Sequence, residues 1–237
     1  MSKSLAVAVL ALSVAACAAP RPRPTVPPPL AQTAEALQLL PAAGTYKIDS
    51  NNSELRILVY RAGPLASFGH NHVIVSHAVV GLVQIGNDIS DSSFSLSVPV
   101  ESFVIDDAQS RLEEGSDFSG DVAEDAKSGT RRNMLGSAML NAAEFAEIDV
   151  KSVALAGTPG AVTADLTLSI AGRESTISAP FSLQGDAHQL TATGSMQLQQ
   201  TAIGLTPYSL LHGALQVQDA MLLKFKIAVP IEKEPAD

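Results

Sequence analysis

Apolar and polar residues alternate with a period of two along much of the chain between residues 55 and 231. Side chains of a β-strand point alternately to opposite faces, so this period predicts strands that bury one face. The segments that show it lie at residues 55–59, 79–85, 94–100, 166–170, 177–183, 190–198, 215–217 and 221–231. About eight short strands at this spacing predict an all-β fold, either a closed antiparallel barrel or a sandwich.

Two of these segments, 166–170 and 177–183, are separated by the turn-rich sequence Ala171-Gly172-Arg173-Glu174, which predicts a β-hairpin. The faces expected to point inward mix large apolar residues with small ones. The small residues are Ala164, Ala179, Ala192, Gly194 and Gly81. An eight-stranded barrel is near the size at which side chains either fill the interior or leave room for one ligand. Small inward residues favour a ligand cavity, although a tapered or tightly coiled barrel would also use them.

The segment from Ala108 to Ala146 lacks the strand period and predicts a short helical insertion. Residues 111–114 and 138–141 are typical of helical or irregular structure, whereas the acidic, glycine-bearing stretch 117–127 is expected to be a mobile surface loop. Such an insertion either covers one open end of the barrel or is a solvent-exposed segment without a functional role. The basic pair Arg131-Arg132 is expected to balance the acidic loop on the surface.

Residues 1–16 have the features of a signal peptide: Lys3, a short apolar run and small residues before the cleavage site. The sequence around this site, Val14-Ala15-Ala16-Cys17, resembles a lipobox, in which the cysteine is acylated and becomes the first mature residue. Cys17 is the only cysteine of the chain. We therefore expect a lipid anchor at Cys17; the alternative is an unmodified cysteine near an ordinary cleavage site.

Residues 17–43 contain many prolines and are expected to form an extended tether between the anchor and a folded domain at 44–232. Ala18 follows the cysteine where an aspartate would favour retention at the inner membrane. By resemblance to Gram-negative lipoproteins, the expected location is the periplasm, anchored to the outer membrane through the lipid.

The formal charge is −9 and the chain contains no tryptophan. An acidic chain without a basic patch is a poor binder of nucleic acid, and few aromatic side chains are present to stack on bases. Nucleic acid is therefore not expected as a partner, and the sequence gives no indication of the oligomeric state.

Several short motifs occur in order along the chain: Tyr46-Lys47-Ile48-Asp49, Gly69-His70-Asn71-His72, Leu166 to Gly172, Thr201 to Leu205 and Val217-Gln218-Asp219. In this order and spacing the chain resembles the YceI-like, polyisoprenoid-binding family over nearly the whole domain. The resemblance implies an eight-stranded antiparallel barrel, lipocalin-like in outline. It also implies that a long isoprenoid is bound in an apolar tunnel. Beyond such a bound polyisoprenoid or lipid, the sequence indicates no cofactor.

His70 and His72 lie two residues apart, so on a strand both imidazoles would point to the same side. Two such imidazoles can share a metal ion if a third ligand approaches. His212 could supply that ligand from another strand. A metal site of His70, His72 and His212 is therefore one hypothesis for these residues.

A second hypothesis places the three histidines at the mouth of the tunnel, together with Tyr60, Arg61 and Tyr208, where they would contact a polar or anionic head group. A third is that His70 and His72 only hydrogen-bond nearby backbone where Gly69 turns the chain. The residues alone do not decide between the three.

No Gly-x-Ser-x-Gly or other nucleophile-and-base motif is present, and the carboxylate pairs Asp106-Asp107 and Glu113-Glu114 are expected at the surface. The predicted function is therefore that of a non-enzymatic, exported lipoprotein that binds a long apolar ligand. The alternatives are a histidine-based metal-binding protein or enzyme and a structural lipoprotein of the envelope.

Overall fold

The protein, described here by a computed structural model, is built around one twelve-stranded antiparallel sheet in the part of the chain that the structure describes, residues 40–231. The strands are β1 Gly44–Lys47, β2 Glu54–Ala62, β3 His72–Ser76, β4 Val80–Ile85, β5 Ser93–Pro99, β6 Val104–Ile105, β7 Glu147–Thr158, β8 Ala161–Ile170, β9 Arg173–Gly185, β10 Gln189–Gln199, β11 Ser209–Leu210 and β12 Leu215–Pro230. Their order is β1-β4-β5-β7-β8-β9-β10-β12-β2-β3-β6, and β11 pairs with β12 off this path. Cys17, residues 1–16 and the tether up to residue 39 lie outside the described residues.

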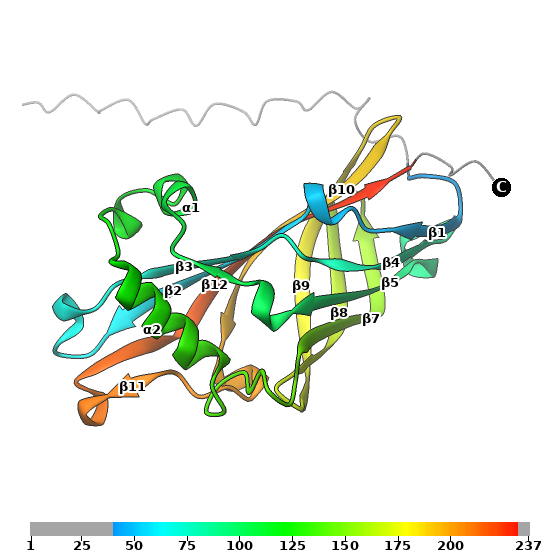
Figure 1. The fold of residues 1–237 in the computed structure, drawn as a ribbon. Helices are drawn as coiled ribbons and strands as arrows, with labels where there is room; N and C mark the ends of the chain where they lie inside the picture. The colour runs from blue at the N-terminus through cyan, green and yellow to red at the C-terminus, as the bar shows by residue number, and fades with distance from the viewer. Residues whose placement is uncertain (1–39, 232–237) are drawn as a thin grey trace, which may run out of the picture. The chain divides into compact units, whose positions relative to one another are not determined.

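The sheet curves into a half-barrel that stays open, since its terminal strands β1 and β6 are not paired with each other among the described residues (Figure 1). The all-β antiparallel prediction is confirmed, whereas the eight strands and the closed lipocalin-like barrel are not. The two sides of the sheet approach each other where the chain leaves β1: the Ile48 N–H donates to the Gly81 carbonyl (3.1 Å) and the Asp49 N–H to the Ala228 carbonyl (2.9 Å).

Three of the additional strands, β6, β7 and β11, are elements that the period of two could not reveal. β6 and β11 have two residues each, too few for any alternation. β7 is twelve residues long, but its register shifts between Ser152 and Ala154 opposite β8, and the apolar run Val153-Ala154-Leu155-Ala156 follows. A β-bulge adds one residue and so moves the apolar positions to the other parity. The predicted segments 215–217 and 221–231, in contrast, belong to the single long strand β12.

The hairpin predicted around Gly172 is confirmed. Ile170 of β8 pairs with Arg173 of β9, and the two residues between them, Ala171 and Gly172, both have positive φ. This is the geometry of a two-residue turn whose twist matches that of the flanking strands. A side chain at Gly172 would lie 2.4 Å from the ring of Phe145, so glycine is also required by packing.

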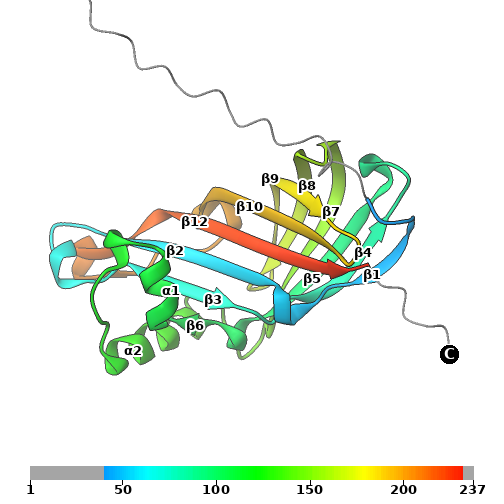
Figure 2. The same cartoon turned by 90° about the horizontal axis from the view of Figure 1, so that it is seen from above.

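The insertion forms α1 (Ala108–Glu113), a 3-10 turn at Ser116–Phe118 and α2 (Glu124–Leu135). In Figures 1 and 2 both helices lie beside β2 and β3, away from β7 and β8. Phe118 is 2% exposed and packs on Leu58, Val73 and Val75. The stretch 117–127, expected to be a surface loop, thus contains one buried aromatic residue and the start of α2, which its many acidic residues did not indicate.

The second helix closes part of the main core, to which Met134 of α2 and Leu140 of the following turn contribute. Arg131 donates hydrogen bonds to the carbonyls of Phe103 and Glu101. It therefore joins α2 to the segment before β6 and is not only a solvated charge that balances an acidic loop. No helix of the described part is long and apolar enough to span a bilayer.

Candidate ligand-binding cavity

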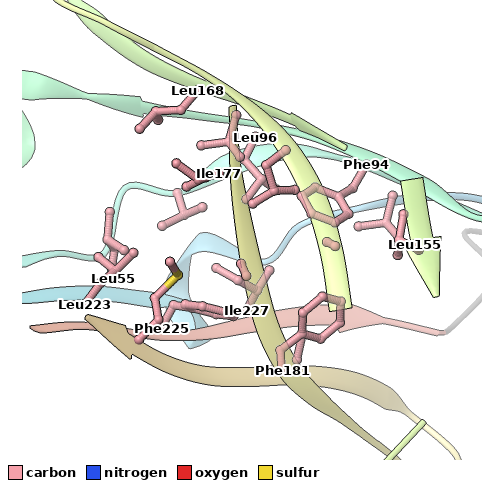
Figure 3. A pocket seen from close by; sticks show the side chains of 18 of the residues that line it. Leu55, Phe94, Leu96, Leu155, Leu168, Ile177, Phe181, Leu223, Phe225 and Ile227 are labelled. Carbon is pink, nitrogen blue, oxygen red and sulfur yellow. The ribbon is translucent and has the colours of Figure 1, made fainter. Parts of the chain in front are cut away.

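The half-barrel holds a partly open cavity of about 210 Å³. Eight strands contribute to its wall, namely β2, β4, β5, β7, β8, β9, β10 and β12. Apart from the hydroxyl-bearing Ser92 and Ser93, every lining residue is apolar. Figure 3 shows Leu55, Phe94 and Phe181, from three different strands, directed into this space. A wall of this kind offers almost no partner to a charged or strongly polar molecule.

The cavity follows from the alternation in the sequence. Along β9 the residues Ile177, Ala179, Phe181 and Leu183 line the cavity, while Ser178 and Pro180 between them are exposed. Neighbouring strands repeat this parity, since the register pairs Ala164 of β8 with Ala179 of β9. The inward residues therefore come from one face of a continuous sheet, as the sequence predicted.

The small residues expected on this face divide into two groups. Ala164, Ala179 and Ala192 line the cavity and leave it room. Gly81 and Gly194 are not among the lining residues, and each permits a close approach instead. A Cβ atom at Gly194 would lie 2.3 Å from the ring of Phe225, and one at Gly81 would lie 2.1 Å from the Ser95 carbonyl oxygen. The idea that all five small residues create space is thus right for the alanines alone.

None of the six residues predicted at a tunnel mouth lines this cavity. Tyr60 packs against Phe118, with ring centroids 5.5 Å apart, in the cluster between β2, β3 and the insertion. The Arg61 guanidinium donates to the Gly69 carbonyl (2.7 Å). The Tyr208 carbonyl accepts from the Val217 N–H, and His212 is exposed in the turn before β12. The structure therefore distributes these residues around the β2–β3 and β11–β12 turns, outside the apolar wall.

His72 is held by a buried carboxylate that sequence reasoning had placed at the surface. Its Nδ1 donates to Asp106 Oδ2 at 2.6 Å, and the Asp106 side chain has no exposed surface. Asp106 Oδ1 accepts hydrogen bonds from the Val73 N–H (2.9 Å) and from Arg111 (2.6 Å). Burial on its own would raise the pKa of Asp106, but the hydrogen bonds from His72, Val73 and Arg111 outweigh it and lower that pKa.

The proposed metal trio is not assembled. His70 is exposed, with its ring centroid 6.4 Å from that of His72, while His72 is directed at Asp106. No group of three or more histidine, cysteine, aspartate or glutamate side chains among the described residues is placed to hold a metal ion. The interpretation that His72 only contacts backbone was also incomplete, because Asp106 lies 34 residues further along the chain and nothing local signals the pairing.

The carboxylates Glu113 and Glu114 at the end of α1 serve the packing of the insertion on the sheet. Arg56 of β2, only 8% exposed, pairs with Glu54, Glu113 and Glu114, and Lys224 of β12 reaches Glu114 at 2.6 Å. Burial opposes the charge of Arg56, yet its three carboxylate partners hold its pKa above the ordinary value. Burial likewise acts against the charge of Glu114, but Lys224 and Arg56 lower its pKa. These ion pairs fasten α1 to β2 and β12.

A family model described as "YceI-like domain" matches residues 46–229. Among solved structures, the chain is similar to BcnA of Burkholderia cenocepacia, with 14% identity and a TM-score of 0.57 over 76% of this chain and 98% of that one. It is also similar to a YCEI protein of Campylobacter jejuni, with 10% identity and a TM-score of 0.46 over 66% of this chain and 82% of that one. No curated protein matches. At such identity the likeness to BcnA concerns the fold alone.

Proposed function

Because the chain belongs to the YceI-like family, we propose that it binds one apolar, chain-like molecule in the cavity of the half-barrel and carries or stores it without chemical change. The family is known for polyisoprenoid binding in a barrel fold. The observation that carries the proposal for this chain is the wall itself: eight strands supply apolar side chains, and no charged residue is among them. An apolar wall of this kind favours apolar guests, because a polar group placed against it would lose its hydrogen bonds to water without replacement.

The shape of the wall favours a thin, flexible guest over a compact one. On β12 the lining residues run from Met221 to Val229, which corresponds to about 26 Å at roughly 3.3 Å per residue. The volume of about 210 Å³ is small for a wall of that length and lies below the usual range of ligand pockets. A linear hydrocarbon chain can use a narrow space along the sheet, whereas a bulky ring system cannot.

Ser92 and Ser93 offer the cavity little polar surface. The Ser92 hydroxyl accepts from the Gly86 N–H and donates to the Asp88 carbonyl, both at 3.0 Å, and Ser93 is exposed on the strand face opposite to Phe94. We propose that the part of the ligand inside the cavity carries no polar group, and that the histidines considered from the sequence do not contact it.

Export and anchoring complete the proposed role, and the residues that support them lie outside the described part. A signal peptide at 1–16 and acylation of Cys17 would place the domain in the periplasm, tethered to the outer membrane. Metabolic labelling with a radioactive fatty acid tests this: label should enter the wild-type protein and be absent from Cys17→Ser. Equal labelling of both would refute acylation at this residue.

The binding function is tested by extracting the purified full-length protein with organic solvent and analysing the extract by mass spectrometry. We expect one apolar species in near-stoichiometric amount, and we expect detergent-treated, emptied protein to take it up again. Recovery of no apolar species, together with failure of the emptied protein to bind linear isoprenoids or fatty acids, would contradict the proposal and favour a purely structural role.

A further inference from the structure

Two turns project side by side at the end of the sheet where β2 ends and β12 begins (Figures 1 and 2). The first covers residues 63–70 between β2 and β3, and the second covers residues 208–214 around β11. We call them the paired turns. The Leu65 N–H donates to the Ala214 carbonyl (2.8 Å), and a side chain at Gly63 would lie 2.6 Å from the same oxygen. The two turns are therefore in direct contact and form one surface.

This surface is unusually apolar for exposed turns. Phe68 is 77% exposed and Leu211 is 68% exposed, with Leu210 and Leu65 also exposed beside them. Loop tips are normally polar, and a cluster of large apolar side chains in water marks a site of contact with another apolar phase. None of these residues lines the cavity, so the ligand proposed above does not account for them.

The exposed Leu211 lies in a strained part of the second turn. Leu211 and His212 both have positive φ, 51° and 55°, and Gly213 follows at 90°. A leucine with positive φ is uncommon, and this backbone conformation costs free energy. The Leu211 side chain is exposed, so its burial does not offset that cost. Strain that presents an apolar residue to solvent points to a function for that presentation.

The charge of the paired turns indicates what they contact. The chain contains 24 acidic residues, yet none lies between Tyr60 and Asn71 or between Thr206 and Gln218. Within these two spans the exposed residues that can carry charge are Arg61, His70 and His212, all of them basic; outside the spans, the exposed Asp117 of the insertion lies beside the first turn, where its carbonyl accepts from Asn71. Apolar side chains among basic ones are typical of segments that lie in the interface of an anionic bilayer, where the two kinds of group reach acyl chains and phosphates respectively.

We propose that the paired turns dock on the surface of a lipid bilayer that carries anionic head groups, with Phe68 and Leu211 inserted among the acyl chains and Arg61 beside the phosphates. The inference does not rest on the proposed ligand. It adds a second membrane contact, made by the folded domain itself, at the β2–β12 end of the sheet.

Because the chain contains no tryptophan, a single Phe68→Trp change creates a fluorescent reporter of local insertion. The full-length protein carries Cys17→Ser throughout, so that no acyl chain can attach there. We expect tryptophan emission to shift to shorter wavelength, and to be quenched by brominated acyl chains, in vesicles of equal parts phosphatidylglycerol and phosphatidylethanolamine. The shift should weaken in phosphatidylcholine vesicles and as salt is raised.

Leu112 on α1 provides a matched control, since it is 75% exposed but lies outside the paired turns. Leu112→Trp should show no shift with the same vesicles. Adding Leu211→Ser to the Phe68→Trp protein should weaken vesicle binding about tenfold, the loss expected when one large apolar side chain no longer inserts. Absence of a shift for Phe68→Trp, or equal shifts at both positions, would overturn the proposal and leave a protein partner as the occupant of this surface.

Discussion

The Nδ1 atom of His72 lies 2.6 Å from Oδ2 of Asp106, whose side chain has no exposed surface. His72 belongs to β3, while Asp106 follows β6 and precedes α1. The opposite oxygen of Asp106 binds Arg111 of α1 at 2.6 Å. One carboxylate therefore ties the edge of the sheet to the insertion, and the integrity of the β3–α1 region depends on it.

Asp106→Ala should strongly destabilise the protein. The change leaves Arg111, with a side chain only 8% exposed, without its ion partner, and breaking a buried pair in this way costs about 3–5 kcal/mol. Urea unfolding followed by circular dichroism measures the loss. The neighbouring Asp107 is a matched control: it caps α1 by accepting from the Ser110 N–H, so Asp107→Ala should cost only about 1 kcal/mol. Equal losses of unfolding free energy in the two variants would contradict a larger stabilising contribution from the buried Asp106.

The same carboxylate predicts how stability depends on pH. Hydrogen bonds lower the pKa of folded Asp106 despite its burial. A carboxylate with a depressed pKa stabilises the fold above its unfolded pKa of about 3.9, and that contribution is lost as the pH falls through the folded pKa. Unfolding free energies measured between pH 7 and 2 should therefore fall more steeply below about pH 4 in the wild-type protein than in Asp106→Asn. Parallel curves would contradict this.

The ion pair between Arg56 and Glu114 should show strong coupling in a double-mutant cycle. Both side chains are largely buried, and they lie 2.9 Å apart. We expect Arg56→Met and Glu114→Gln to interact by about 1–3 kcal/mol in unfolding free energy. The exposed pair Lys127 and Glu124 of α2, 2.7 Å apart, serves as the comparison, and water should screen it to the point that no coupling is detected.

Gly194→Ala should destabilise β10, because the new Cβ would lie 2.3 Å from the ring of Phe225. Crowding of this kind costs about 1–3 kcal/mol. Thermal unfolding of Gly194→Ala, with and without Phe225→Leu, measures the part of the clash due to the ring, which the smaller side chain should relieve, while the Pro180 carbonyl oxygen, 2.7 Å from the new Cβ, remains. Gly160→Ala is the control, since nothing lies within 4 Å of a Cβ there and the backbone is unstrained. Failure of Phe225→Leu to restore any stability would contradict the clash with the ring and assign the cost to the Pro180 carbonyl oxygen.

Ala192→Met should fill part of the cavity and exclude the ligand. Ala192 lines the cavity, so the longer side chain occupies space that we assign to the guest. We expect binding of the extracted apolar species to weaken by about tenfold, equivalent to roughly 1.4 kcal/mol, while the melting temperature stays the same or rises. Ala154→Met on the exposed part of β7 should leave binding unchanged. Unaltered binding in Ala192→Met would place the ligand elsewhere.

Sequence reasoning succeeded for properties that are local. The parity of side chains along β9 follows from backbone geometry at each residue, so Ile177, Ala179 and Phe181 could be assigned to one face without knowledge of any partner. The turn at Ala171-Gly172 is equally local, since a two-residue hairpin turn depends on the positive φ of these two adjacent residues.

The tertiary structure alone decided what depends on distant partners. The bulge between Ser152 and Ala154 hid β7, and the pairing of β1 and β6 with other strands left the sheet open. Asp106 and Glu114 were expected at the surface, but the strands and α1 bury them against His72 and Arg56. Alternation tells which face of a strand is apolar, because it is a property of consecutive residues. It carries no information on which strand, helix or charged residue packs against that strand, because those contacts join residues far apart in the chain.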